Sequence, residues 1–594
     1  MNLFNVADVY IDRIVNSTSK ARQGAINVNE QSRIKVLLLD KETVSTISMC
    51  ATQSELLDHE IFLIDTIENA SRDVMRHLKC LVYVKPCEES IRCLVQELQN
   101  PKYGEYHIFF NNMVSKSQLE RLAEADNLEV VVKIEEIFQD YQILDQDLFS
   151  FDLESGTLFK EDLSIWNASG LNTCVNSLLS VLLSLKVRPD IRFDKNSKLC
   201  NKLARELNND IEKHDKALFD FPTMDAPPML IILDRQNDPM TPLLQPWTYR
   251  SMINEYIGIK RNIVDLSGIP DIDKDLIKVT LSSKQDPFFH DTVYLNFGEL
   301  GDKVKQYVNN YKKATKSNSK IDTIEDIKNF IEKYPEFRKL SGNVAKHMAI
   351  VSELDRQLKL RDIWEISEVE QNLSVHKDNQ EDYDNLIKIL ETPQVKFFYK
   401  IKLACIFLLR HSENNVKINQ LVEILKNQGV SMEELSLFYK FKKIIEAKLK
   451  RDLNKGQDEG NSVDNKDNDL LSELARKFNT RMESAKNLSQ GRKAQNDNVY
   501  MQHIPDISTM LTDLSKNKLS QVKFGIIGGT QSKEAITPAS VVVPQDVIIF
   551  VVGGVTYEEA RLVRQFNETM KGKMRVILGG TSVISTSDYL SSFS

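Results

Sequence analysis

Two aspartates near the middle of the chain have a spacing that could support acid–base or metal chemistry. Asp234 directly follows the apolar run Met229–Leu233, and Asp238 comes four residues later. The run is typical of a buried strand in a parallel sheet, and α/β enzymes keep their chemistry at the carboxyl ends of such strands. The alternative is a structural elbow in which Asp234 caps the turn and pairs with Arg235 or another neighbour. We favour the elbow, because no His, Cys or Lys stands nearby to complete a catalytic set.

Two glycine turns near the C-terminus suggest a second kind of chemistry, the binding of phosphate. They are Gly553–Thr556 (GGVT) and Gly579–Ser582 (GGTS), and each follows an apolar run. Glycine turns that lead into a helix can cradle phosphate, so these turns are the best argument for a nucleotide- or phosphate-dependent enzyme. Neither turn has a lysine at Walker spacing or matches GxGxxG or GxSxG. The structural interpretation, which we favour, is a tight strand exit with Thr556 as helix N-cap, followed by Glu558 and Glu559.

Composition excludes several classes of function. The 594 residues suffice for about three or four domains. A net charge of −8 argues against a nucleic-acid binder. The seven cysteines include no CxxC pair, so we expect reduced thiols, no metal and no cofactor. The N-terminus does not resemble a signal peptide, and the apolar region near Leu178–Val187 is shorter than the roughly eighteen residues that a membrane span needs. Membrane contact is therefore expected only through partners.

Apolar runs alternate with helix-like segments in the N-terminal part of the chain. The predicted strands are Ile34–Asp40, Ile61–Ile64, Leu81–Val84, His107–Phe110 and Leu128–Val132. The predicted helices are Asn5–Ser17, Lys41–Met49, Glu68–His77, Glu89–Asn100 and Ser117–Ala125. This alternation predicts a doubly wound parallel α/β sheet in a first domain, residues 1–142. The first strand ends without glycine, so a dinucleotide fingerprint is absent.

The rest of the chain predicts a second α/β domain interrupted by a helical one. Residues 143–253 hold a buried helix, Asn172–Leu185, and the strand Met229–Leu233. Two late buried strands, Val547–Val552 and Met574–Leu578, lie in residues 480–594 and have no adjacent domain of their own, so we expect them to complete the second domain. Residues 254–479 are predicted mostly helical, with a hairpin around 323–360.

Long motifs in order along the chain resemble the SM family, cytosolic proteins that bind syntaxins and promote SNARE-driven membrane fusion. The central one is LDRQNDPMTPLLQPWTY. Others are MNLFNVADVYIDRIV, NPKYGEYHIFFNN, GELGDKVKQYV, FIEKYPEFRKLSGNVAKHMAIV and VVGGVTYEEARLV, which most resemble the vacuolar protein sorting branch acting between Golgi and endosome. The resemblance implies an arch-shaped fold of two parallel-sheet α/β domains and one largely helical domain carrying a helical hairpin.

The resemblance also implies which residues bind partners. An apolar pocket on the outside of the first domain would bind the N-terminal peptide of a syntaxin, with Glu136 at its rim to meet a basic residue. Its lining would be Val114, Leu119, Val131 and Ile134. The alternative is that these apolar residues belong to the core, the interpretation we prefer for Leu122. On the inner face of the domain, the syntaxin helical bundle would meet Asp40, Lys41 and Ser45, although a charge after a strand is more often a solvated loop or helix cap.

In the helical domain, the resemblance implies that Pro335 is the hinge of a hairpin that switches between folded-back and extended forms. Met348, Val344 and Val351 would then face a SNARE helix. The alternatives are a plain helix–turn–helix corner at Pro335, because proline breaks a helix, and a core role for the apolar stripe.

Three functions remain open at this stage. The first is a non-enzymatic SNARE chaperone, monomeric, with no nucleic-acid partner, that binds a Golgi or endosomal syntaxin-type (Qa) SNARE and aligns it with a vesicle R-SNARE. We expect such a protein in the cytoplasm and at Golgi, endosomal and vesicle membranes. The second is the phosphate-dependent enzyme with no complete catalytic set, and the third is a generic α/β scaffold. The resemblance favours the first.

Overall fold

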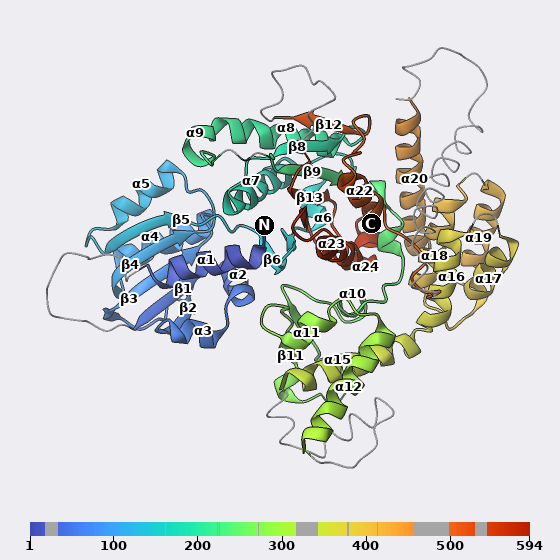
Figure 1. The fold of residues 1–594 in the computed structure, drawn as a ribbon, viewed down its shortest axis with the longest axis horizontal. Coiled ribbons are helices and arrows are strands. Elements are labelled where there is room, and N and C mark those ends of the chain that lie inside the picture. The colour runs from blue at the N-terminus through green and yellow to red at the C-terminus, as the bar shows by residue number, and fades with distance from the viewer. Residues whose placement is uncertain are drawn as a thin grey trace. The chain divides into compact units, whose positions relative to one another are not determined.

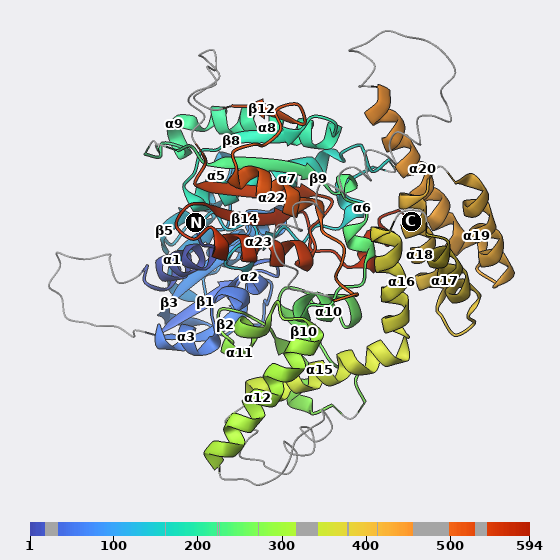
Figure 2. The ribbon, with the colours of Figure 1, turned by 45° about the vertical axis from the view of Figure 1, so that its right-hand side comes forward.

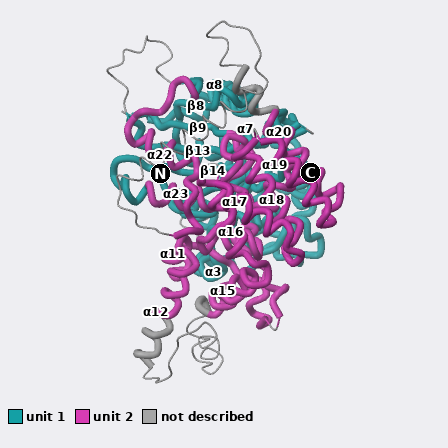
Figure 3. Tube along the Cα trace, turned by 90° about the vertical axis from the view of Figure 1, so that its right-hand side faces the viewer, with its two compact units in different colours: residues 1–233, 524–552, 567–582 teal, residues 234–523, 553–566, 583–594 magenta. Residues whose placement is uncertain are grey.

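The computed structural model describes residues 1–17, 34–160, 162–222, 224, 226–270, 272–315, 342–376, 379–412, 414–454, 498–528 and 543–593. These residues form two compact units (Figure 3). The first unit contains residues 1–233, 524–552 and 567–582, and the second contains residues 234–523, 553–566 and 583–594. Each unit thus combines segments that are far apart in the sequence.

The first unit begins with a five-stranded sheet in the order β2-β1-β3-β4-β5 (blue in Figure 1). All of its neighbouring strands are parallel, as predicted. The strands are β1 (Lys35–Leu39), β2 (Ile61–Thr66), β3 (Met75–Val84), β4 (Tyr103–Phe110) and β5 (Val131–Glu136). The helices are α1 (Leu3–Val15), α2 (Thr43–Cys50), α3 (Gln53–Asp58), α4 (Glu88–Gln99) and α5 (Lys116–Ala125).

The two faces of this sheet bury separate sets of side chains. On one face, Leu37 and Leu39 of β1 pack with apolar residues of α1, α2 and α3. On the other, Val36 and Leu38 pack with apolar residues of α4 and α5. Successive side chains of a strand point to opposite faces, so a strand covered on both faces is apolar throughout. This explains the uninterrupted sequence of β1 and confirms the doubly wound arrangement.

The helix predicted over Glu68–His77 is wrong. Residues 67–74 form turns, and β3 already begins at Met75, which pairs with Tyr103 of β4. Arg72 in this segment donates to Glu97 Oε2 at 2.8 Å in a buried ion pair. A tertiary contact therefore overrides local helix propensity here.

The second sheet of the first unit has seven strands in the order β12-β8-β9-β13-β14-β7-β6. They are β6 (Gln142–Asp145), β7 (Leu148–Ser150), β8 (Asp190–Asp194), β9 (Met229–Asp234), β12 (Phe524–Ile527), β13 (Asp546–Val552) and β14 (Arg575–Gly580). Figure 2 shows the red C-terminal strands in one sheet with β8 and β9. The prediction that the C-terminal segment completes this sheet is confirmed.

This sheet is mixed, whereas the sequence predicts a parallel one. β6 runs antiparallel to β7, and β12 runs antiparallel to β8, at opposite ends of the sheet. The pairs β8–β9, β13–β14 and β14–β7 are parallel. Only two residues separate β6 from β7, and so short a connection allows only an antiparallel pair.

Helix α7 (Ala168–Leu185) is the predicted buried helix of the second sheet. By length and composition it is the one helix in the described part of the chain that could cross a membrane, and 67% of its span is buried by the protein itself. Leu178 and Leu182 belong to the same core as Ile548 of β13. α7 therefore has the burial of a core helix. The remaining helices of this unit are α6 (Ser155–Leu158), α8 (Lys198–Lys213) and α9 (Asp215–Leu218).

The second unit is mostly helical. It contains α10 (Tyr249–Tyr256), α11 (Pro287–Thr292), α12 (Phe297–Thr315), α15 (Gly342–Leu360), α16 (Ile363–Val375), α17 (Gln380–Glu391), α18 (Phe397–Arg410), α19 (Asn415–Asn427), α20 (Met432–Asn454), α22 (Asp506–Ser515), α23 (Tyr557–Thr569) and α24 (Thr586–Ser591). The small antiparallel pair β10 (Ile263–Asp265) and β11 (Lys278–Thr280) accompanies them. α23 passes into the first unit after Phe566.

A buried ion pair holds two distant segments of the second unit together. Arg235 Nη1 donates to both carboxylate oxygens of Glu559, at 2.9 and 2.8 Å, and both side chains are about 95% buried. Gly553 has φ +94°, and a Cβ at this position would lie 2.8 Å from Cβ of Arg235. The glycine turn is therefore required both by its backbone conformation and by the close approach of Arg235.

We expect Glu559→Gln to destabilise the protein by about 3 kcal/mol, the lower end for breaking a buried ion pair, because Arg235 would lose its closer carboxylate partner and keep only Asp238, at 3.6 Å. The change should lower the midpoint of thermal unfolding followed by circular dichroism. Asp355→Asn is the matched control, because Asp355 pairs with Lys359 on an exposed helix face. Equal midpoints for the two variants would contradict a structural role for the buried pair.

Candidate functional site

The predicted peptide-binding residues lie around strand β5, at one edge of the first sheet. In the register of β4 and β5, Ile108 pairs with Ile134 and Phe110 pairs with Glu136. Ile108 and Phe110 belong to the core that contains Leu122 of α5. Since cross-strand partners share a face of the sheet, Ile134 and Glu136 lie on the face covered by α4 and α5.

The other predicted residues join them on that face. Val114 and Val131 are partly buried and pack against the same core. The Val114 N–H donates to Glu136 Oε1 at 2.7 Å, which holds the carboxylate beside the start of α5. Leu119 is also partly buried and lies on α5, three residues before Leu122. The structure therefore places Val114, Val131, Ile134 and Glu136 on one face and Leu119 on the helix that covers it. We call these five residues the α5–β5 surface.

Local sequence explains why α5 and β5 are held in this arrangement. Ser115 caps α5 in a capping box with Gln118, which fixes where the helix begins. At the other end, the carboxylate of Asp126 accepts the N–H groups of Val130 and Val131 at 2.9 and 3.0 Å. The turn into β5 is thereby tied to the end of α5. Leu122 is 1% exposed, so its predicted core role is confirmed.

Two exposed apolar residues near this surface were not predicted as binding residues. Leu128 is 58% exposed and Val132 is 53% exposed. The register moves from the pair Tyr106–Val131 to the pair His107–Lys133, so Val132 is the extra residue of a β-bulge. A run such as LEVVV reads as a buried strand. Nothing in the run itself indicates that the strand is an edge or that it contains a bulge.

The three residues predicted to meet the syntaxin bundle follow β1 and differ in burial. Asp40 is 1% exposed. Its carboxylate accepts the N–H groups of Thr43 and Lys85 and the hydroxyl of Ser90, at 2.8, 2.7 and 2.7 Å. Asp40 therefore stabilises the loop through buried hydrogen bonds, and its prediction as a contact residue is wrong. Lys41 and Ser45 are not buried, so their contact with the syntaxin bundle stays a prediction.

The predicted SNARE-facing stripe of α15 is not a free surface. Met348 is 5% exposed and Val351 is 2% exposed. α15 packs against α10, and its His347 Nδ1 lies 2.7 Å from the hydroxyl of Tyr249. Burial in the second unit therefore contradicts a groove-lining role for Met348 and Val351 in this structure. Pro335 and the side chain of Val344 lie outside the described residues.

The aspartates after β9 have structural roles. Asp234 accepts the N–H of Gln236 at 2.9 Å and caps a 3-10 turn, as the elbow interpretation predicts. Asp238 is buried and accepts both the N–H and the hydroxyl of Thr241. Burial raises the pKa of the Asp238 carboxyl, but the positive charge of Arg235 and the hydrogen bonds from Thr241 are among the effects that together outweigh it and hold the pKa below its ordinary value. Asp238 is therefore an ionised carboxylate that its neighbours already use.

The two glycine turns also have structural roles. Thr556 and Glu559 form reciprocal hydrogen bonds at the start of α23, so the first turn is a capped strand exit. In the second, Gly579 lies within β14, and a Cβ there would meet the ring of Phe149 at 2.0 Å. Close packing rather than phosphate requires this glycine. The features that favoured the enzyme hypothesis are thus used internally.

Metal chemistry has little support in this structure. Within the described ranges, no group of three or more His, Cys, Asp or Glu side chains is arranged to hold a metal ion. The seven cysteines are free thiols, and five of them are buried. Burial raises the pKa of Cys174 to about 12, so this thiol stays protonated and does not act as a nucleophile.

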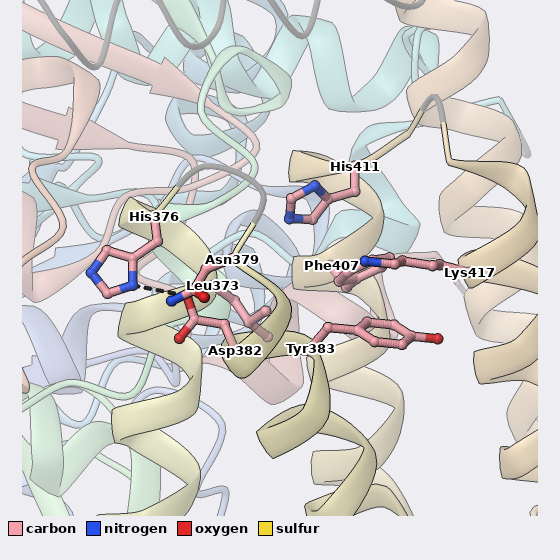
Figure 4. A pocket seen from close by; sticks show the side chains of 8 residues that line it. All are labelled: Leu373, His376, Asn379, Asp382, Tyr383, Phe407, His411 and Lys417. Carbon is pink, nitrogen blue, oxygen red and sulfur yellow. Dashed lines mark hydrogen bonds and ion pairs between the residues drawn. The ribbon is translucent and has the colours of Figure 1, made fainter.

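A small polar pocket lies among the helices α16–α19 of the second unit (Figure 4). His376 Nδ1 lies 2.8 Å from Asp382. Lys417 donates to Gln380 at 3.2 Å and sits over the ring of Tyr383. These charged groups already interact with one another or with a neighbouring ring, so we assign no ligand to this pocket.

Comparison with known proteins defines the family to which this chain belongs. The model of the Sec1 family matches residues 35–592, and the chain belongs to this family. Among its relatives, vacuolar protein sorting-associated protein 45 of Saccharomyces cerevisiae is 60% identical over 600 residues, covering 100% of this chain and 99% of that one. The human protein of the same name is 37% identical over 561 residues, covering 94% and 92%. The solved structure of SM protein Vps45 in complex with Qa SNARE Tlg2 (1-310) matches with a TM-score of 0.82 and 38% identity, covering 100% and 98%. The family and branch predicted from the motifs are confirmed.

We expect Asp40→Ala to destabilise the protein by about 1–3 kcal/mol, because the N–H groups of Thr43 and Lys85 would lose a buried acceptor. Urea unfolding followed by circular dichroism measures the change. In the control Lys41→Ala, the midpoint should stay at the wild-type value, since the ion pair of Lys41 with Glu89 is exposed. A stable Asp40→Ala variant would return Asp40 to the list of candidate contact residues.

Proposed function

We propose that this protein is an SM-type SNARE chaperone that binds a Golgi or endosomal Qa SNARE and promotes SNARE assembly for vesicle fusion and transport to the endosome and vacuole. The observation that carries the proposal is the α5–β5 surface, where the partly buried Val114, Leu119 and Val131 and the exposed Ile134 lie beside the carboxylate of Glu136. The similarity to a Vps45 structure solved in complex with the Qa SNARE Tlg2 supports it.

The chemistry of the α5–β5 surface suits the N-terminal peptide of a SNARE. Val114, Leu119, Val131 and Ile134 offer apolar area that a short peptide can cover with one or two apolar side chains. The Glu136 carboxylate attracts a basic residue of the same peptide. The Val114 N–H holds Glu136 Oε1 at 2.7 Å, so the charge is positioned before the peptide arrives, which reduces the entropy lost on binding.

Assembly requires a second contact with the SNARE helices. We assign this contact to Lys41 and Ser45 and to the hairpin around residues 323–360, with Pro335 as hinge and Val344 in the groove. Met348 and Val351 are left out because they are buried. The protein would hold two SNARE helices in register before they assemble into a bundle. This offsets part of the conformational entropy that disordered segments lose on folding.

The proposed protein is not an enzyme, works as a monomer and needs no cofactor. The structural roles of Asp234, Asp238 and both glycine turns support this part of the proposal, since they remove the features on which a phosphate-dependent reaction rested. We place the protein in the cytoplasm, with peripheral association at Golgi, endosomal and vesicle membranes through its SNARE partners.

Calorimetry with a synthetic N-terminal peptide of a Golgi or endosomal Qa SNARE tests the proposal. We expect the wild-type protein to bind the peptide and Leu119→Arg to lose binding by at least tenfold, because the variant places a charge in the apolar contact. ATP and GTP should produce no binding heat. Thermal unfolding of Leu119→Arg checks that the fold is kept.

The matched control is Phe62→Arg. Phe62 is apolar and 60% exposed, and it lies on β2 at the opposite edge of the same sheet. This variant should bind the peptide as the wild type does. Peptide affinity that is unchanged by Leu119→Arg would refute the site, and nucleotide binding without peptide binding would refute the proposed function.

A further inference from the structure

A pocket in the second unit is separate from every residue assigned above to SNARE binding. Its lining comes from three segments that are distant in the sequence: the loop after Asp238, the stretch that leads into α22, and the first turn of α23. Gln371 of α16 completes it. The lining residues that matter most for binding are Gln245, Trp247, Tyr500, Met501, His503 and Glu558.

Gln245 presents a buried hydrogen-bond donor in this pocket. The residue is 3% exposed. Its Oε1 accepts the hydroxyl of Tyr256 at 2.9 Å, and its backbone N–H donates to Glu370 at 2.9 Å. Its Nε2 has no hydrogen-bond partner among the residues that the structure describes. Leaving a buried amide N–H without an acceptor is unfavourable, so this group favours a ligand that brings an acceptor.

His503 presents an acceptor in the same pocket. The hydroxyl of Thr241 donates to Asp238 Oδ2 and lies 3.2 Å from His503 Nε2. Because that hydroxyl proton is already used, Nε2 must carry the imidazole proton and donate it. His503 Nδ1 is then an unprotonated acceptor, and it is buried without a partner in the described part of the chain.

The pocket is electrically neutral apart from one matched pair. Burial lowers the pKa of His503, so its imidazole is uncharged near neutral pH. Arg561 Nε donates to Glu558 Oε2 at 3.0 Å, and Glu558 Oε1 accepts the hydroxyls of Thr248 and Ser251. A charged ligand would lose its hydration here without a counterion, which is unfavourable. The polar requirement is therefore for a neutral group.

The remaining walls are apolar and aromatic. The rings of Trp247 and Tyr500 lie 4.9 Å apart, and Leu244, Pro246, Met501 and Pro505 supply further apolar surface. The indole N–H of Trp247 donates to Ser367 at 2.7 Å, so this ring offers only its apolar faces to the pocket. Such walls suit the methylene stem of a side chain that carries its polar group at the end.

We propose that this pocket binds the carboxamide of a glutamine or asparagine side chain presented by a partner protein. The carboxamide oxygen accepts from Gln245 Nε2, the carboxamide N–H donates to His503 Nδ1, and the stem packs against Trp247 and Tyr500. A carboxamide is neutral and carries an acceptor oxygen and an N–H donor on the same planar group, so it can meet both the unpaired donor and the unpaired acceptor of the pocket. This site does not depend on the α5–β5 surface.

The test uses the full chain with 13C-labelled methionine methyl groups and three capped amino acids. The probes are N-acetyl-glutamine methylamide and the corresponding derivatives of glutamate and methionine, which have similar size and differ in their end groups. The methyl signal of Met501, assigned through Met501→Leu, reports binding. We expect the glutamine compound to shift this signal and to bind at least fivefold more tightly than the other two.

Two variants separate hydrogen bonding from shape. Gln245→Met removes the donor, and we expect it to abolish the preference for glutamine. Tyr500→Leu removes an aromatic wall but neither polar group, so it should weaken all three compounds by similar factors and keep the preference. Thermal unfolding verifies both folds; if Gln245→Met does not fold, the ranking of the three compounds on the wild type, and its retention in Tyr500→Leu, decide the carboxamide assignment.

Equal shifts by all three compounds, or no shift by any, would overturn the carboxamide assignment and leave a pocket that holds water only. A preference for glutamate would overturn the neutral character of the site. Because the readout is confined to the second unit, loss of SNARE-peptide binding by Leu119→Arg leaves this result unaffected.

Discussion

The buried pair of Arg235 and Glu559 is the constraint on which much of the second unit depends. The two residues are 324 positions apart in the sequence, yet Glu559 receives two hydrogen bonds from one guanidinium nitrogen. Arg235 Nη2 also donates to the carbonyl oxygen of Asp238 at 2.8 Å. Buried charges are tolerated only when they are fully paired, so this pair requires the C-terminal segment to return to the loop that follows β9.

Several other features depend on this contact between the C-terminal segment and the loop after β9. The close approach of Arg235 requires glycine at position 553, and Glu559 caps α23 together with Thr556. Asp238 in turn accepts the N–H of Asp506 at 3.1 Å, which positions the stretch that leads into α22. The proposed carboxamide pocket is lined by these same segments. The loop after β9, whose aspartates could have been catalytic, instead connects several segments of the second unit. The unpaired hydrogen-bonding groups of Gln245 and His503 lie in the pocket beside it.

In the first unit, the proposed function depends on an edge of a sheet. Central strands such as β1 are covered on both faces, and their side chains belong to the two cores. β5 has one neighbouring strand, and the side chains beside α5 remain partly buried and apolar. An edge strand exposes surface that the protein must cover or use. Here the hydrogen bond from Val114 to Glu136 fixes the arrangement of the edge, which is what a rigid docking surface for a flexible peptide needs.

By itself, the sequence determined the fold class, four of the five strands and most helices of the first sheet, the joining of the C-terminus to the second sheet, and the structural nature of Asp234 and GGVT; the fifth strand begins at Val131 rather than at the predicted Leu128. These depend on local signals, since apolar runs, caps and glycine turns act over a few residues. Only the tertiary structure decided that residues 68–77 are not helical, that Asp40 is buried, and that Met348 and Val351 are packed inside. It also decided that Val132 is exposed in a bulge. Burial depends on what packs against a residue, and the partners seen here are distant in the sequence: Glu97 for Arg72, Lys85 for Asp40 and Tyr249 for His347 of α15. A short window of sequence cannot contain that information.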